Sequence, residues 1–233
     1  LEHGLEITEQ EAWTKRPTPI ELRVPEYIRE IVEQLAFSAR EEKKVDQRSG
    51  VSQRLPISAL ENVISNAERR ALAAGEAVAV PRVLDIYAAL PSITGKIELE
   101  YEGELKGGET VARELIRLST GKVFTSYFDG ENLQQVVQYF ELGGTLKMDE
   151  TAASADMLKE LTRVQGLLEK TGKLGLGVSE PDALRASAAE FILEGLYAHR
   201  RINRNEEAGF MAEPRRREPP GDDPKKSTRR QYQ

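Results

Sequence analysis

The most informative stretch of the chain is Gly50-Val51-Ser52-Gln53-Arg54, here called the turn, which lies between a charged run and an amphipathic segment. Apolar residues recur after the turn at three- and four-residue spacing, which predicts a helix that begins directly behind it. Glycine permits backbone conformations that are costly for other residues, and serine often caps the start of a helix. Arginine carries a fixed fork of donors that can engage phosphate oxygens at two points. The turn therefore combines a helix start with an anion-binding side chain.

Along the rest of the chain, apolar periodicity predicts a mainly α-helical fold. The expected helices cover approximately residues 25–40, 55–74, 81–91, 109–124, 133–140, 152–171 and 179–201. The first three lie within a short stretch and form a small bundle. A short strand is predicted over 21–24, and alternation of apolar residues with glutamates over 97–101 favours another, followed by a loop from Gly103 to Gly108.

Four regions are expected along the chain. Residues 1–24 form an irregular connector, 25–106 a helical unit with the turn, and 107–202 a second helical region. Ser179 and Asp182 form a predicted capping box for the last helix. From Asn203 the periodicity stops, and prolines occur among arginine and lysine runs. Residues 203–233 are therefore expected to be a disordered basic tail, solvated rather than bound to a specific partner.

Composition excludes several classes of site. The formal net charge of −6 gives no general attraction to nucleic acid. The chain has no cysteine, which excludes disulfides and thiolate chemistry and fits a cytoplasmic location. Its two histidines, His3 and His199, lie near opposite ends, which excludes a histidine-rich metal site. No apolar run is long enough to predict a membrane span, so a membrane is not an expected partner.

The sequence contains no phosphate loop of the pattern G-x-x-x-x-G-K-[ST]. Two Gly-Lys pairs, Gly95-Lys96 and Gly121-Lys122, lack both the earlier glycine and the following hydroxyl residue that would hold Mg²⁺. Residues 148–150, Met-Asp-Glu, only faintly resemble an acidic metal motif. A lysine lies just before them, where a buried strand would be apolar.

The sequence from Val45 to Arg54, together with residues 60–71 behind it, resembles the lid of AAA+ ATPases of the MoxR and magnesium-chelatase subunit I branch. In that branch a G-[AV]-S-x-R turn, called sensor 2, opens a lid helix. Residues 81–91 and 93–101 are similar to the same lid. The resemblance is good from about Trp13 to Phe124, weaker to Arg204 and absent in the tail.

The resemblance implies that residues 25–106 are the lid and that 1–24 connect it to an AAA+ core upstream. It implies Arg54 as the phosphate-contacting residue, acting across a subunit boundary, with Gly50 and Ser52 shaping the turn. Arg48 is a neighbouring candidate without an assigned role. ATP and Mg²⁺ would be the cofactors of the full-length protein, and this chain alone would have no catalytic activity.

The partners implied by the resemblance are the chain's own AAA+ core, neighbouring subunits of a hexameric ring, and a protein with a von Willebrand A domain that the ATPase remodels. Two other classes stay open. A transcriptional adaptor would use the basic tail or a helix-turn-helix within 25–91, although Glu61 and Glu68 balance Arg69 and Arg70 on the candidate recognition helix. A structural helical scaffold would need no arginine at the turn.

Overall fold

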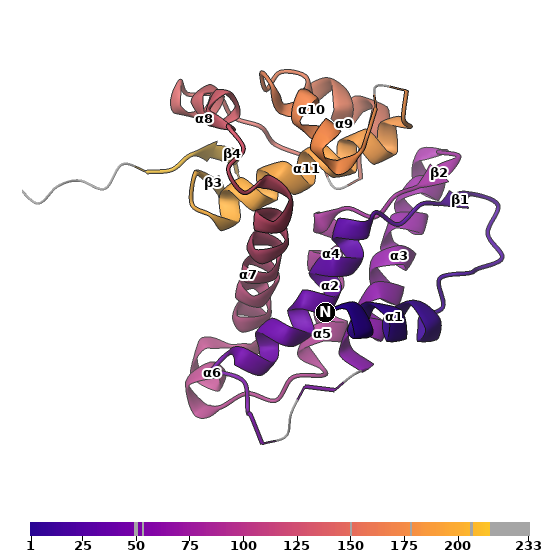
Figure 1. The fold of residues 1–233 in the computed structure, drawn as a ribbon, viewed down its shortest axis with the longest axis vertical. Coiled ribbons are helices and arrows are strands. Elements are labelled where there is room, and N and C mark those ends of the chain that lie inside the picture. Colours follow the sequence, from indigo (N-terminus) through magenta and orange to yellow (C-terminus); the bar gives the residue numbers. More distant parts are fainter. Residues whose placement is uncertain (49–50, 53, 150, 178, 206, 215–233) are drawn as a thin grey trace, which may run out of the picture.

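In the computed structural model, helices make up most of the chain, as the apolar periodicity predicts (Figure 1). The structure describes residues 1–48, 51–52, 54–149, 151–177, 179–205 and 207–214. Its helices are α1 (Glu2–Glu11), α2 (Glu26–Glu41), α3 (Arg54–Ala74), α4 (Val83–Ala88), α5 (Leu90–Thr94), α6 (Tyr101–Lys106), α7 (Gly108–Phe128), α8 (Gln134–Glu141), α9 (Ser154–Leu161), α10 (Leu167–Lys170), the 3₁₀ helix η1 (Thr171–Leu174) and α11 (Asp182–Ala198). Its strands are β1 (Glu21–Leu22), β2 (Val78–Ala79), β3 (Ile202–Asn205) and β4 (Gly209–Ala212).

Helices α2 and α3 bury the apolar stripes that their spacing predicts. In α2 the inward residues are fully buried: Ile28, Ile31, Val32, Leu35, Ala36 and Ala39. In α3, Leu60 and Ile64 are buried and Ile57 is half-buried against the same core. Pro25 precedes α2, and Gly75, with a positive φ of 68°, follows α3. Burial of a 3.6-residue stripe thus fixes how both helices face the core.

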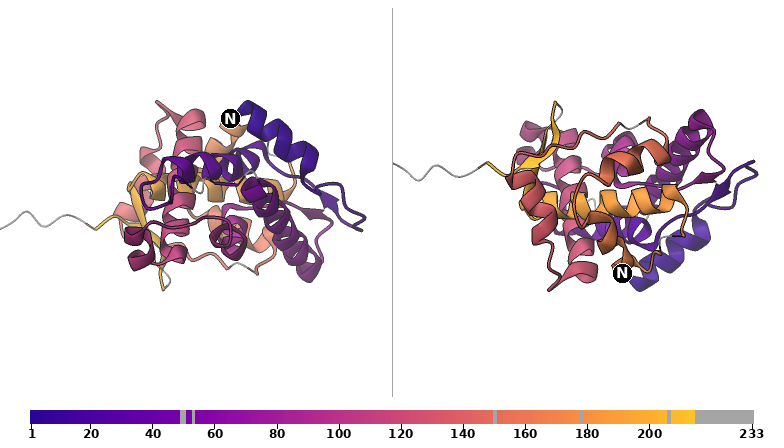
Figure 2. Two further views of the ribbon diagram at one scale, coloured as in Figure 1. Left: turned by 90° about the horizontal axis from the view of Figure 1, so that it is seen from below. Right: turned by 90° about the horizontal axis from the view of Figure 1, so that it is seen from above.

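The long helix α7 packs against α2 and α11 and joins the N-terminal helices to the C-terminal ones (Figure 1). Seen from above, α11 runs across the middle of the molecule (Figure 2). Gly195 of α11 lies directly against the buried ring of Phe124 in α7, where a Cβ atom would overlap the ring. A Cβ on Gly121 would come within 3.1 Å of Ala198. Two glycines therefore permit the close approach of α7 and α11.

One apolar core extends through the described chain, from Ala12 to Phe210. It includes residues of α2 and α3 together with residues of α7 and α11, which belong to the two different helical regions expected from the sequence. Ring stacking continues across the same boundary, since Tyr27 of α2 lies 4.5 Å from Phe191 of α11 between ring centroids. The apolar core is therefore continuous across residues 106 and 107.

A buried ionic cluster, formed by Arg70, Arg82, Asp85 and Glu190, joins α3, α4 and α11. Arg70 donates to Asp85 across 2.8 Å, and the backbone N–H of Arg82 donates to the same carboxylate across 2.7 Å. Nε of Arg82 lies 3.7 Å from Glu190, which also accepts from the backbone of the first turn of α4. Buried charges need such pairing, because removal from water is costly. The cluster therefore fixes the contact between these helices.

The N-terminal region differs from the predicted irregular connector. Residues 2–11 form α1, which packs on α2 and α3, and Thr8 of α1 donates to the buried Glu33 of α2 across 2.9 Å. The predicted strand over 21–24 is confirmed as the short β1, which pairs in parallel with β2. A polar helix held by tertiary contacts lacks the strong apolar stripe from which helices are predicted.

The prediction of a strand over 97–101 and a loop over 103–108 was wrong. Only an isolated bridge between Leu99 and Val45 forms, and the chain then enters α6 at Tyr101. Glutamates at alternating positions suit the exposed side of a short helix as well as a strand.

The single helix predicted over 152–171 is divided into α9, α10 and η1. Gly166, with a φ of 75°, adopts the left-handed conformation immediately before α10, which ends any continuous helix. The predicted capping box of Ser179 and Asp182 is also wrong, because α11 begins at Asp182 behind Pro181 without a side-chain cap.

The region predicted as a tail begins with ordered structure. Strands β3 and β4 form an antiparallel hairpin over residues 202–212, and Phe210 bridges to Leu146. Phe210 is buried, and Gly209 turns with a φ of 70°. The expected disordered tail therefore cannot begin at Asn203, while residues 215–233 lie outside the described part of the chain.

Candidate functional site

Ser52 and Arg54 form the start of α3. The backbone N–H of Arg54 donates to the Ser52 hydroxyl across 3.1 Å, and the N–H of Leu55 donates to the Ser52 carbonyl across 2.9 Å. These bonds satisfy N–H groups that have no partner within a helix. Ser52 therefore makes the local hydrogen bonds of a helix cap, whereas Gly50 and Gln53 lie outside the described residues.

The chain just before the turn is held against the segment that precedes α6. Val45 is buried and bridges to Leu99, and the backbone N–H of Asp46 donates to the Glu98 carbonyl across 2.8 Å. Within the turn, Val51 is buried and its carbonyl accepts from the Arg40 guanidinium of α2 across 3.4 Å. These contacts place the turn beside residues 95–98.

A surface depression of about 590 Å³ opens between the turn and this segment. Its lining residues are Val51, Ser52, Arg54, Gly95, Lys96, Ile97 and Glu98. Two cations, Arg54 and Lys96, thus share one depression with a single carboxylate, Glu98. The described lining carries a net charge of +1, in a chain whose total is −6.

The side chain of Arg54 is exposed at the first residue of α3. Its guanidinium makes no hydrogen bond or ion pair to any residue that the structure describes. The first turn of α3 contains no acidic residue, although the positive end of the helix dipole favours one there. An arginine at this position opposes the dipole, so helix stability does not explain its presence. Its guanidinium is the group here that favours an anion, because Ser52 already accepts from the backbone N–H groups of Arg54 and Leu55 and Pro56 has none.

Lys96 is the residue that sequence reasoning missed. It was considered only as part of a failed phosphate-loop match, because its neighbours in sequence give no sign of a site. Its proximity to Arg54 depends on the antiparallel contact of residues 44–46 with 98–100, including the 2.9 Å bond from Glu100 N–H to the Lys44 carbonyl. Arg48, by contrast, is exposed and is not part of the lining.

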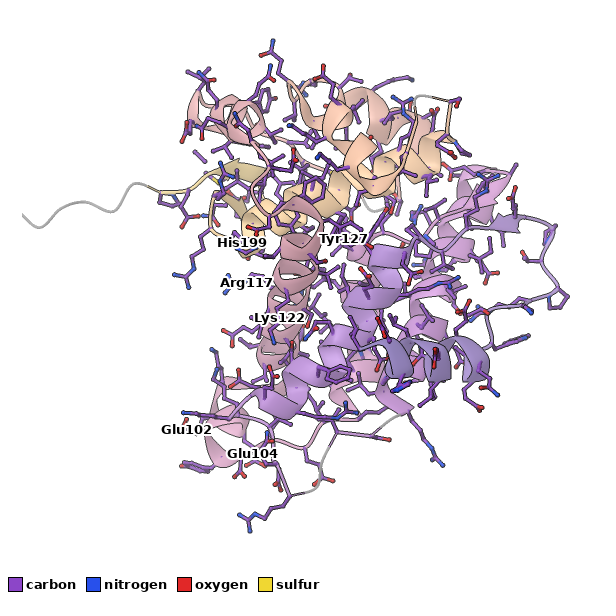
Figure 3. The ribbon with its side chains drawn as sticks, viewed as in Figure 1. Glu102, Glu104, Arg117, Lys122, Tyr127 and His199 are labelled. Atoms are coloured by element: carbon purple, nitrogen blue, oxygen red, sulfur yellow. The ribbon has the colours of Figure 1, made fainter. Side chains whose placement is uncertain are left out.

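The remaining candidates have local structural roles. Asp149 accepts hydrogen bonds from the N–H and hydroxyl of Thr151 across 2.8 and 2.7 Å, and these bonds lower its pKa. Its neighbour in the acidic motif, residue 150, is not described. Nε2 of His199 lies 3.1 Å from the Thr125 hydroxyl and 3.2 Å from the Gly121 carbonyl, at the contact between α11 and α7 (Figure 3).

Within the described residues, no cluster of three or more His, Asp or Glu side chains is arranged to hold a metal ion. No helix in the described part of the chain is both long enough and apolar enough to span a membrane. Comparison of the chain with protein-family models, with curated proteins and with solved structures gives no match.

Proposed function

We propose that this chain is the C-terminal lid part of a MoxR/magnesium-chelatase-like AAA+ ATPase, in which Arg54 contacts nucleotide phosphate within an assembled ring. The observation that carries the proposal is the exposed Arg54 guanidinium at the N-terminus of α3, without an acidic partner among the described residues. The sequence resemblance gives this arginine a nucleotide-sensing role, and its setting suits that role.

Three features of the chain suit a phosphate at the turn. The guanidinium of Arg54 offers paired N–H donors, and Lys96 supplies a second positive charge from the same depression. The N-terminal end of α3 adds the positive end of its dipole. Because phosphoryl transfer spreads negative charge over the equatorial oxygens, a guanidinium positioned beside them lowers the barrier.

In the proposal, the residues that bind ATP and Mg²⁺ belong to a core segment outside these 233 residues. Bound ATP would supply the phosphoryl group, and Mg²⁺ would be held by acids of a core segment, since no described cluster suits a metal. Residues 1–24 would join that core to the lid. Closure of the lid would couple nucleotide hydrolysis to remodelling of a partner, for which the resemblance suggests a protein with a von Willebrand A domain.

The test compares ATP hydrolysis by the full-length ring protein carrying Arg54→Ala, Arg54→Lys or Arg48→Ala. Arg48→Ala is the matched control, because Arg48 is an exposed arginine near the turn but outside the depression. Loss of one transition-state arginine is expected to lower turnover by about 10³- to 10⁵-fold, and by less if the lid mainly senses nucleotide. Arg54→Lys keeps the charge but not the fork, so partial recovery is expected.

Wild-type turnover in Arg54→Ala rejects the proposed role and favours a structural scaffold or an adaptor. An equal loss of turnover in Arg48→Ala would mean that the effect comes from general surface charge and not from a phosphate contact of Arg54. Lys96→Ala provides a further comparison, with a smaller expected loss, because a flexible ammonium lacks the paired donors of arginine.

A further inference from the structure

A second positively charged region lies away from the turn, where α4, α7 and the β3–β4 hairpin meet. A cavity of about 420 Å³ is lined by Leu84, Arg113, Leu146, Lys147, Met148, Arg204, Asn205, Gly209 and Phe210. Another of about 280 Å³ is lined by Tyr87, Thr110, Arg113, Glu114, Arg117, Tyr197 and Arg204. Arg113 and Arg204 line both cavities, so the two cavities adjoin, and together they are here called the arginine groove.

Aromatic rings hold the three arginines of this groove. The guanidinium carbon of Arg204 lies 5.3 Å from the ring centroid of Tyr87, and that of Arg113 lies 6.0 Å from the same ring. Arg117, which projects from α7, lies 5.6 Å from the ring of Tyr197 (Figure 3). A guanidinium held over a ring face keeps the N–H donors at its edge for another partner. The rings thus pre-organise the donors.

The charges of the groove do not cancel. Arg204 is paired with the buried Glu194, and Arg113 with the exposed Glu109 across 2.8 Å. The one lining carboxylate, Glu114, already binds Lys106 across 2.6 Å. Arg117 and Lys147 have no acidic partner within the described residues. An acidic chain thus presents at least two uncompensated cations in one groove.

We propose that the arginine groove binds a small phosphate-bearing molecule, with the uncompensated Arg117 and Lys147 as the principal contacts and Arg113 and Arg204 as further ones. Arg113 and Arg117 are four residues apart on α7, so their side chains lie on one face of the helix. Guanidinium forks match phosphate oxygens, and the larger cavity, about 420 Å³, falls within the range of small-molecule sites, roughly 300–1,000 Å³. Because these residues are separate from the Arg54 turn, the inference does not depend on the proposed ATPase role.

The test is calorimetric titration of inorganic pyrophosphate into the full chain at pH 7, with Arg117→Ala, Lys147→Ala and Arg48→Ala beside the wild type. Arg117→Ala is expected to weaken binding about tenfold, the loss of one charge-assisted contact. Lys147→Ala, an exposed change that leaves the packing of α7 intact, is expected to weaken it by about two- to fivefold. The control Arg48→Ala should bind as the wild type does.

Several outcomes would overturn the inference. One is the absence of pyrophosphate binding to the wild type. Another is loss of binding in Arg54→Ala but not in Arg117→Ala or Lys147→Ala, which would place the anion at the turn. Citrate binding as tight as that of pyrophosphate would reject the phosphate class, because the groove would then select charge alone. Circular dichroism of each variant, with Lys147→Ala as the second probe, separates lost binding from lost folding.

Discussion

The two ends of α3 place arginines in opposite settings. Arg54 begins the helix with its side chain in solvent and without an acidic partner among the described residues. Arg70, near the other end, is buried and donates to Asp85 across 2.8 Å and to the Val80 carbonyl across 3.0 Å. Arg70 therefore stabilises the packing of α3, whereas packing does not explain the presence of Arg54.

The difference follows from the cost of desolvation. A guanidinium removed from water is tolerated only where carboxylates and carbonyls replace the water, as in the buried ionic cluster. A guanidinium left in water contributes little to folding, so its position is free to serve a ligand. The comparison predicts that changes in the buried cluster alter stability, whereas changes at the turn alter function.

The largest effect is expected for Asp85→Ala. Asp85 accepts from Arg70, from the backbone of Arg82 and from Asn66, the last across 2.6 Å. Its removal leaves a buried guanidinium without its carboxylate, which typically costs about 3–5 kcal/mol. Urea unfolding measures this loss. Asp156→Ala is the control, because the pair of Asp156 with Lys159 is exposed and its loss is expected to change stability far less. Equal losses of unfolding free energy in the two variants would contradict the proposed difference between buried and exposed ion pairs.

A smaller effect is expected from pH. The pKa of Glu194 is raised to about 7, chiefly by burial and to a lesser extent by the nearby Glu190, although Arg204 opposes the shift. The folded state therefore binds a proton that the unfolded state releases between about pH 4.5 and pH 7, so stability falls as pH rises through this window. The contribution is at most about 3 kcal/mol.

Unfolding in urea from pH 4.5 to pH 8 measures this dependence, and Glu194→Gln is expected to flatten it. Part of the slope should remain, because burial also raises the pKa of Glu30, Glu33 and Glu190. An unchanged slope in Glu194→Gln would contradict the assignment of this titration to the carboxylate beside Arg204.

The sequence was most informative where burial and periodicity agree. The helices α2 and α3 follow apolar stripes between clear boundaries, and these stripes are buried. Prediction failed where short elements depend on distant contacts. Helix α1 is held through Thr8 and Glu33, and the β3–β4 hairpin through the bridge of Phe210 to Leu146. Such contacts leave no periodic signal.

The candidate site divides in the same way. Ser52 and the exposed position of Arg54 follow from local rules for helix starts, and both could be predicted. Lys96 could not, because a contact between distant segments brings it to the turn. The acidic partners of the buried Arg70 and Arg82 could not be predicted either. Asp85 and Glu190 lie in helices, where a lone acid is usually exposed to solvent, and nothing in the sequence marks them as buried.

The smallest stability effect is expected at Arg54 itself. Arg54→Ala removes an exposed side chain without a described partner, so the free energy of unfolding should change by about 0.5 kcal/mol or less. Arg54→Glu places an acid at the positive end of the α3 dipole and should stabilise the chain by about 0.3–1 kcal/mol. Urea unfolding of this chain measures both changes. In the full-length ring the same Glu variant should lose ATP turnover, because its charge repels phosphate. A loss of 2 kcal/mol or more in Arg54→Ala would instead show that the arginine supports the fold, and the contrast between the two ends of α3 would fail.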